Sequence, residues 1–501
     1  MRAVALALLA TLALSCGRQA PAPRPITAAG AASAPAPSPV VVARPLAAPP
    51  GSVIGDYAVS WEPAAGTLKV EARLTAGAGS RLVLERGAEP FARDVEASAD
   101  RDGAAWSPVA RRGSHFEAAP CASGACRLRY RYALREASRK IDDLDTAAEE
   151  SELVEAPPST WLLAPGRSTA HDQRLRFRVT TPEGSRFVTG VFRSAEAPDA
   201  WDIALDDLWT SPYSAFGALR VRPVPVIGGD VQLAISPGKT PVSEDDLAKW
   251  TSDAGRAVSG YYGRFPMPGA LVLIAIARGR WVGSGRTLSG GGGTVFVRVG
   301  EQAPARAYRD DWVLVHEMIH LTFPSVSRDQ DWAEEGVATY VEPFARVRAG
   351  LLSAEDAWAG LMNGLPNGLP AAGDEGLDHT HTWGRIYWGG ALFWFLADVE
   401  IHKRTRNRMG LEHALRGVVD AGGTNAVRWP LADVMKAGDR ATGVPVLTEL
   451  YAAMSAAPHP VDLEEILASL GVAMVRGRVR FDEQAPLADV RRAITHGTEP
   501  R

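Results

Sequence analysis

The sequence predicts a multidomain protein of the α+β class, with an N-terminal antiparallel β domain, then an α/β domain, then a mainly helical C-terminal part. Short runs of alternating apolar and polar residues fill the chain from about Val53 to Val224, and a period of two is typical of antiparallel strands. From about Gly228 strand-like and helix-like segments alternate, and beyond Val341 helical patterns dominate. A length of 501 residues fits about three domains.

The first sixteen residues predict a signal peptide, because Arg2 precedes an apolar run that ends at Leu14 and is followed by Ser15-Cys16. The run is too short to span a bilayer, which needs roughly 20 apolar residues. The small residue before Cys16 resembles the bacterial lipobox, in which this cysteine is lipidated and becomes the mature N-terminus. Ala13 stands where Leu is usual, so ordinary cleavage remains an alternative.

Residues 17–50 are rich in Ala and Pro and poor in large apolar residues, which predicts a disordered linker that holds a domain away from a membrane. We therefore expect an exported lipoprotein of the bacterial cell envelope, on the periplasmic side or on the outer membrane surface. The membrane is expected as a partner only through this lipid anchor.

The N-terminal β domain is expected over residues 51–225, and no catalytic constellation occurs in it. It contains Cys121 and Cys126, the two cysteines that remain once Cys16 is set aside. An even pair in an exported chain predicts a disulfide. In the chain-entropy model so small a loop contributes roughly 2 kcal/mol, enough to pin a turn without deciding the fold.

The α/β subdomain is expected over residues 226–345, with strands at 231–235, 271–277 and 294–299 and a helix that begins near Ser243. The C-terminal subdomain, residues 346–501, should be mainly helical to about Leu470, with a last run, 472–494, that folds back as strand and helix. Its apolar helix over 386–397 is too short to cross a bilayer and is expected in the core.

The segment from Val313 to Tyr340 contains a HExxH motif and predicts a metal centre. On a helix, His316 and His320 leave the same face one turn apart, so both imidazoles can bind one ion. Glu317 lies between them, where its carboxylate can take a proton from zinc-bound water. The alternative is a His pair on an ordinary amphipathic helix, but a chance HExxH among ten histidines is on the order of one in a hundred.

Zinc in a catalytic site needs a third protein ligand and an open fourth position, and Glu335 and Glu334 are the candidates. The run Trp332–Tyr340 resembles the Asn-Glu-Gly-Phe-Ala-Ser-Tyr signature of gluzincin zinc metallopeptidases, in which the Glu directly before Gly is the ligand. The resemblance implies one zinc ion on His316, His320 and Glu335. The connection between the second His and this Glu is about one helical turn shorter than in those families.

Further along, Tyr387-Trp-Gly-Gly-Ala resembles the Tyr-x-x-Gly segment of the alanyl and glycyl aminopeptidase families. Their Tyr stabilises the oxyanion that forms when water attacks the carbonyl, and the resemblance gives this role to Tyr387. The later segments 396–401 and 431–435 look more like the glycyl aminopeptidase family. That likeness implies a thermolysin-like α/β catalytic half beside an N-terminal β domain. The alternative is that Tyr387 is a core aromatic residue.

A glycine-rich run follows the strand at 271–277, and we expect Gly291, Gly292 and Gly293 to let the substrate backbone come close. The alternative is a flexible loop without a role. Alanyl-type aminopeptidases carry an amine-gripping Glu at this place, whereas here no acidic residue lies between Arg278 and Gly300. Exopeptidase action is therefore unsupported, and endopeptidase action stays equally open.

The sequence thus predicts an exported zinc peptidase acting on a peptide or protein substrate. A formal net charge of −4 gives no footprint for nucleic acid binding. The alternative is a catalytically inactive, zinc-bearing envelope protein that binds peptides or a protein partner. The oligomeric state does not follow from the sequence.

Overall fold

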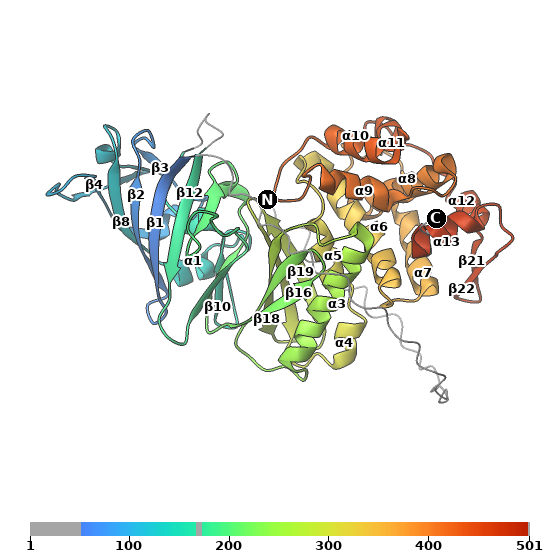
Figure 1. Ribbon diagram of the computed structural model, residues 1–501, viewed down its shortest axis with the longest axis horizontal. Coiled ribbons are helices and arrows are strands. Elements are labelled where there is room, and N and C mark those ends of the chain that lie inside the picture. Colours follow the sequence, from blue (N-terminus) through green and yellow to red (C-terminus); the bar gives the residue numbers. More distant parts are fainter. Residues whose placement is uncertain (1–51, 167–172, 499–501) are drawn as a thin grey trace. The chain divides into compact units, whose positions relative to one another are not determined.

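The computed structural model describes residues 52–166 and 173–498 (Figure 1). The predicted signal peptide, the Ala/Pro-rich linker and the lipidation site at Cys16 lie outside the described residues. No helix within the described residues is both long and apolar enough to cross a bilayer.

The first half of the chain forms three β-sheets. The largest has seven strands in the order β14-β12-β1-β2-β8-β4-β5. Their bounds are Ser52–Glu62 for β1, Thr67–Leu74 for β2, Ala92–Ala99 for β4, Ser107–Pro108 for β5, Cys126–Tyr132 for β8, Gln173–Thr180 for β12 and Trp201–Ala204 for β14. Alternate residues of β2 and β8 are buried, as the period-two pattern predicts.

One pairing in this sheet differs from the antiparallel arrangement that the sequence predicts. β1 and β12 run parallel, with Ser52 opposite Gln173 and Ser60 opposite Thr180, whereas the other neighbours in the sheet are antiparallel. Alternation of buried and exposed residues is the same for both directions, so the pattern in the sequence does not reveal strand direction.

Two four-stranded sheets complete this half, in the orders β13-β15-β10-β9 and β11-β3-β7-β6. Their bounds are Arg81–Val83 (β3), Ala110–Arg112 (β6), His115–Glu117 (β7), Ala148–Glu150 (β9), Leu153–Ala156 (β10), Ala164–Pro165 (β11), Arg186–Thr189 (β13) and Ser214–Gly217 (β15). A disulfide joins Cys121 to Cys126 at the start of β8. Packed aromatic rings fill the core here, namely Trp161, Phe177, Phe187, Trp201 and Phe216.

A five-stranded sheet follows, in the order β16-β17-β18-β20-β19. Its strands are Arg220–Val226 (β16), Gly229–Ile235 (β17), Gly269–Ala277 (β18), Val282–Ser289 (β19) and Gly293–Gly300 (β20). β17, β18 and β20 are parallel, and β19 is an antiparallel edge strand. Because β16 begins at Arg220, this sheet takes in residues that the sequence analysis assigned to the β domain.

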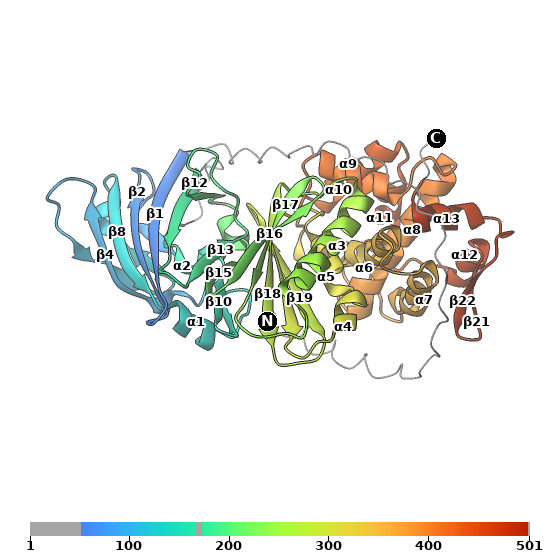
Figure 2. The ribbon, with the colours of Figure 1, turned by 60° about the horizontal axis from the view of Figure 1, so that its bottom comes forward.

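Helix α3, Glu244–Tyr262, lies against this sheet and begins at a capping box on Ser243 (Figure 2). The helices that follow are Ala305–Arg309 (α4), Val313–His320 (α5), Asp331–Arg348 (α6), Ala354–Gly364 (α7), Gly390–Thr405 (α8), Leu411–Asp420 (α9), Leu431–Thr442 (α10), Val446–Met454 (α11), Leu463–Ser469 (α12) and Ala488–His496 (α13). A hairpin of β21 (Val472–Val475) and β22 (Arg478–Phe481) precedes α13.

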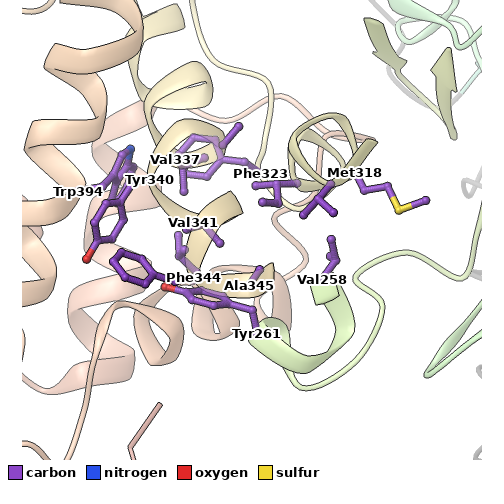
Figure 3. Packing of buried hydrophobic residues seen from close by; sticks show 14 of the residues in the cluster. Val258, Tyr261, Met318, Phe323, Val337, Tyr340, Val341, Phe344, Ala345 and Trp394 are labelled. Carbon is purple, nitrogen blue, oxygen red and sulfur yellow. The ribbon is translucent and has the colours of Figure 1, made fainter. Parts of the chain in front are cut away.

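The core of this half is built around α6, whose buried face contacts α3, α5 and α8. Figure 3 shows side chains from these helices packed together, with Val341 of α6 among Tyr261 of α3, Met318 of α5 and Trp394 of α8. The architecture is therefore a mixed α+β one with several β-sheets and a large helical part. The helices that carry the HExxH motif and Glu335 are held in its apolar interior.

Candidate metal centre and active site

The HExxH helix α5 is short and begins directly after Asp310, Asp311 and Trp312. The carboxylate of Asp311 accepts hydrogen bonds from the backbone N–H groups of Val313 and Leu314, both at 3.0 Å, which satisfies donors that a helix start leaves free. The helix is buried on nearly all sides, and only 6% of His316 is exposed. Both histidines are thereby held on one fixed face.

Gly336, directly after Glu335, sets the distance between α6 and α8. A Cβ atom at Gly336 would lie 2.3 Å from the carbonyl carbon of Gly390, and one at Gly390 would lie 2.0 Å from the carbonyl oxygen of Trp332. Only glycine allows the two helix backbones to approach this closely. The Glu-Gly pair of the sequence therefore joins a candidate ligand to a helix–helix contact.

The structure brings His316, His320 and Glu335 together. Oε2 of Glu335 lies 3.4 Å from Nε2 of His316 and 3.5 Å from Nε2 of His320. One ligand atom from each residue lies within 4.8 Å of the other two. Four ligands arranged tetrahedrally about a zinc ion, with bonds of about 2.0–2.1 Å, are about 3.4 Å apart. The donor types and their spacing thus fit a zinc ion.

Electrostatics at this centre favour a cation. Burial alone would raise the pKa of Glu335, but the two histidines outweigh it and hold that pKa well below its usual range. Burial alone would lower the pKa of His320, but the carboxylate of Glu335 outweighs it and raises that pKa to about 9. An ionised carboxylate between two imidazoles attracts positive charge, and a divalent ion supplies more of it than a proton does.

The rival ligand, Glu334, is directed elsewhere. Its Oε1 accepts a hydrogen bond of 2.7 Å from the backbone N–H of Val326, in the segment between α5 and α6. Burial raises the pKa of Glu334 to about 7. Of the two neighbouring glutamates, Glu335 faces the histidine pair and Glu334 fastens the connecting segment.

The side chain of Glu317, on α5, faces the edge strand β19. Thr287 of β19 donates a hydrogen bond of 2.8 Å to Oε2 of Glu317. A Cβ atom at Gly285 would lie 2.3 Å from Cγ of Glu317, so the strand backbone passes directly over this carboxylate. Burial raises the pKa of Glu317, which favours a carboxylate that accepts a proton. Thr287 is not among the site residues predicted from the sequence, because a threonine in a strand carries no sequence pattern that marks it as part of an active site.

Tyr387 lies in a π-helical turn, η7, which spans Gly384–Gly389 and leads into α8. The sequence analysis expected a regular helix here, but π-helical turns are rare and recur at functional sites. Burial and the carboxylate of Glu335 raise the pKa of Tyr387, and its side chain is hydrogen-bonded to Glu335. An ion pair of 2.7 Å between Arg385 and Asp374 holds the turn. The phenol is thus a protonated donor beside the metal centre.

The glycines expected to admit substrate have another use. Gly292 forms a β-bridge with Val191, and a Cβ atom at Gly292 would lie 2.0 Å from the carbonyl oxygen of Gly190. A Cβ atom at Gly293 would meet the side chain of Leu321 at 2.8 Å, and Gly291 adopts a φ of +67°. The protein's own chain packs against Gly291, Gly292 and Gly293, and their contact with substrate stays a prediction.

Two arginines of β19 and β20, Arg286 and Arg298, form ion pairs within the protein. Arg286 forms an ion pair with the buried Glu155, and Arg298 forms one with Glu150. Both glutamates come from the preceding β-sheets. Their partners lie about 130 to 150 residues away in the chain, so no local pattern could have revealed them.

A second group of similar residues, Asp398, His402 and Glu412, also lies within 4.8 Å but has different surroundings. The oxygens of Asp398 accept hydrogen bonds from Leu411 N–H and the Tyr340 hydroxyl, both at 2.8 Å. Nη2 of Arg348 lies 3.7 Å from Oε2 of Glu412. Two carboxylates facing an arginine and a histidine form a buried charge cluster rather than an open metal site.

Known protein structures resemble this one in fold, but no sequence family matches the chain. No family model and no curated protein matches this sequence. An aminopeptidase N family protein from Idiomarina loihiensis has a similar structure with a TM-score of 0.63 and 13% identity, covering 83% of this chain and 78% of that one.

An M1 zinc metallopeptidase from Deinococcus radiodurans superposes with a TM-score of 0.52 and 15% identity, covering 84% of this chain and 97% of that one. A mutant of that enzyme bound to a Tyr-Ser-Ala substrate superposes with a TM-score of 0.52 and 14% identity, covering 82% of this chain and 95% of that one. The fold is therefore gluzincin aminopeptidase-like, as the sequence motifs implied.

Proposed function

We propose that this chain is a zinc-dependent peptidase with one zinc ion held by His316, His320 and Glu335. The observation that carries the proposal is the convergence of the two imidazoles on one carboxylate oxygen, at 3.4 and 3.5 Å, with Glu317 and Tyr387 beside them. A protein that only bound zinc or peptides would have no need of a base and an oxyanion donor together.

The residues act in sequence on a peptide bond. A zinc ion held by His316, His320 and Glu335 would supply a Lewis acid that activates water and polarises a carbonyl. Glu317, buried and aligned by Thr287, takes the proton from the attacking water and returns it to the leaving amine. Tyr387 turns its hydroxyl from Glu335 to the carbonyl oxygen and donates a hydrogen bond as negative charge develops there.

We propose that β19 presents the substrate. It is the edge strand of its sheet and has one unpaired side, and its Gly285 lies directly over Glu317. A peptide that adds to this edge as a further strand brings its carbonyl groups beside the base. The complex of the Deinococcus radiodurans enzyme with Tyr-Ser-Ala supports a peptide as the substrate class.

The test replaces the base and a ligand separately. Glu317→Gln keeps the shape of the side chain and should retain zinc while peptide hydrolysis is lost. His316→Ala should lose both zinc and hydrolysis. Zinc per chain and peptide cleavage are measured on the same preparations, and hydrolysis by the Gln variant at the wild-type rate would refute the base assignment.

We also propose that the chain is exported and lipidated at Cys16 in the bacterial cell envelope. The residues up to Cys16 support a lipoprotein signal, and a disulfide between Cys121 and Cys126 suits an oxidising compartment. Cys16→Ser should abolish incorporation of labelled fatty acid and release the protein from membranes, whereas Cys121→Ser should leave labelling unchanged. Equal labelling of the Cys16→Ser variant would refute the anchor.

A further inference from the structure

Three of the 14 tryptophans in this sequence expose a large part of their surface within the described residues. Trp281 is 63% exposed, Trp383 45% and Trp312 44%. Tryptophan in a soluble protein normally has most of its ring area covered. Two of the three, Trp312 and Trp383, each contact a residue of the candidate active site.

Trp312 continues the row of imidazoles on α5. It precedes His316 by four residues, as His316 precedes His320, so the three rings follow one another along one helix face. The ring centroids of Trp312 and His316 are 5.4 Å apart with the planes nearly perpendicular, and those of His316 and His320 are 5.0 Å apart. Trp312 is the N-cap residue of α5, so a partly exposed indole stands in ring contact with one of the candidate metal ligands.

Trp383 contacts Tyr387, the proposed oxyanion donor, as Trp312 contacts His316. Its ring centroid is 6.1 Å from that of Tyr387, with the two planes inclined by 30°. The segment before it is anchored by Asp378, which accepts hydrogen bonds of 2.8 Å from Nε1 of Trp332 and 2.9 Å from the hydroxyl of Tyr451. The exposed indole is therefore held in place by structure on both sides, with the buried Arg385 following it.

From these contacts we infer that Trp312 and Trp383 select large apolar or aromatic side chains at the residues next to the scissile bond. The inference rests on the proposed peptidase function and adds a substrate class to it. A substrate carbonyl held between His316 and Tyr387 would have Trp312 in contact with the first of these residues and Trp383 in contact with the second, which would bring the flanking substrate side chains to the indoles. Apolar side chains that cover an exposed indole remove apolar area from water on both partners.

Two arginines of the neighbouring strands β19 and β20 do not compete for this role. Arg286 and Arg298, which could have selected an acidic substrate, are paired with Glu155 and Glu150. None of the arginine–ring contacts found among the described residues involves Trp312 or Trp383. The two indole faces are thus available to a ligand of apolar character.

The test uses the full-length protein and peptides of equal length that carry Phe, Leu, Ala or Ser on each side of one cleavable bond. The wild type should cleave the Phe and Leu peptides with kcat/KM at least tenfold above the Ala peptide. Trp312→Ala and Trp383→Ala should each reduce this ratio severalfold at one of the two flanking positions. Trp312→Phe and Trp383→Phe should retain most of it.

Trp281→Ala is the matched control, since this tryptophan is more exposed but has no ring contact with a site residue. Zinc content and thermal unfolding of every variant are measured alongside, so that a loss of ligand geometry or of folding is recognised. The inference is supported by a Trp312 or Trp383 variant that has the zinc content and melting temperature of the wild type but has lost the preference for the Phe peptide over the Ala peptide.

A binding measurement keeps the inference separate from the peptidase proposal. In a Glu317→Gln background the Phe peptide should quench tryptophan fluorescence and bind at least tenfold more tightly than the Ala peptide, and Trp383→Ala should abolish the difference. Equal affinity for the two peptides, or equal kcat/KM in an active enzyme, would overturn the inference while leaving the peptidase intact. Selective binding without turnover by the wild type would instead overturn the peptidase proposal alone.

Discussion

The single hydroxyl proton of Thr287 in β19 is shared between two oxygens of Glu317, with Oγ1 2.8 Å from Oε2 and 2.9 Å from the backbone carbonyl oxygen. One side chain of the edge strand thus fixes both the helix backbone and the carboxylate of the candidate base. Thr287→Val should lower kcat about tenfold, because a hydrogen bond to a charged group is lost, while KM and zinc content stay near wild type. Thr287→Ser, which keeps the hydroxyl, should recover most of kcat, and a Val variant with unchanged kcat would contradict this positioning role.

Tyr387 should contribute to the transition state and little to ground-state binding. Removing its hydroxyl in Tyr387→Phe should reduce kcat by about 100-fold to 1,000-fold, which is typical for loss of one oxyanion donor. KM and zinc per chain should change little. Tyr308→Phe is the control, since the buried Tyr308 hydroxyl has no hydrogen-bond partner among the residues that the structure describes. An equal loss in both variants would point to a packing effect.

Replacing Glu334 and Glu335 one at a time should show that Glu335 binds the metal and that Glu334 only holds the segment between α5 and α6. Glu335→Gln should lose most bound zinc, because the amide is a poor metal ligand next to the two imidazoles. Glu334→Gln should retain zinc, since Glu334 is bonded to Val326 N–H, and should only modestly lower the melting temperature. Elemental analysis after dialysis against a chelator and zinc restoration measures both. Zinc loss in Glu334→Gln with retention in Glu335→Gln would reverse the ligand assignment.

The buried charge cluster should be a determinant of stability. His402 and Asp398 are 0% and 1% exposed, with Nε2 of His402 3.4 Å from Oδ1 of Asp398. His402→Ala removes the imidazole beside Asp398 and leaves Arg348 and His413, both next to Glu412, as the basic groups of the cluster, which should cost about 3–5 kcal/mol of unfolding free energy. Lys436→Ala, which breaks the exposed pair with Asp433, should change it by less than about 1 kcal/mol. Urea denaturation compares the two, and similar midpoints would count against the cluster.

The burial of the Glu155 carboxyl should make stability depend on pH. Burial raises the pKa of Glu155 from 4.5 to about 7, although Arg286 opposes the shift. Between these values the folded state holds a proton that the unfolded state has released, so the stability from this group is complete below pH 4.5 and is lost as the pH rises to about 7. Glu155→Gln should flatten the slope of unfolding free energy against pH in this window. Parallel slopes for variant and wild type would disprove the shift.

The metal centre could be predicted from sequence because its chemistry is local. His316 and His320 are related by one helical turn, and Glu335 is marked by the glycine that follows it. The parallel pairing of β1 with β12, the turn at Tyr387 and the contact of Thr287 with Glu317 depend on residues far apart in the chain or on backbone detail. The packing of the glycine run could not be predicted for the same reason, since Gly190 and Val191, which lie against it, are about 100 residues earlier in the chain.

The parallel pairing of β1 with β12 has a consequence for truncated forms of the chain. β1 is hydrogen-bonded on one side to its sequence neighbour β2 and on the other to a strand that begins at Gln173. Until β12 is in place, β1 keeps a row of unsatisfied peptide groups, and an exposed strand edge of this kind recruits other chains. A fragment that ends before Gln173 should therefore aggregate instead of forming a soluble domain.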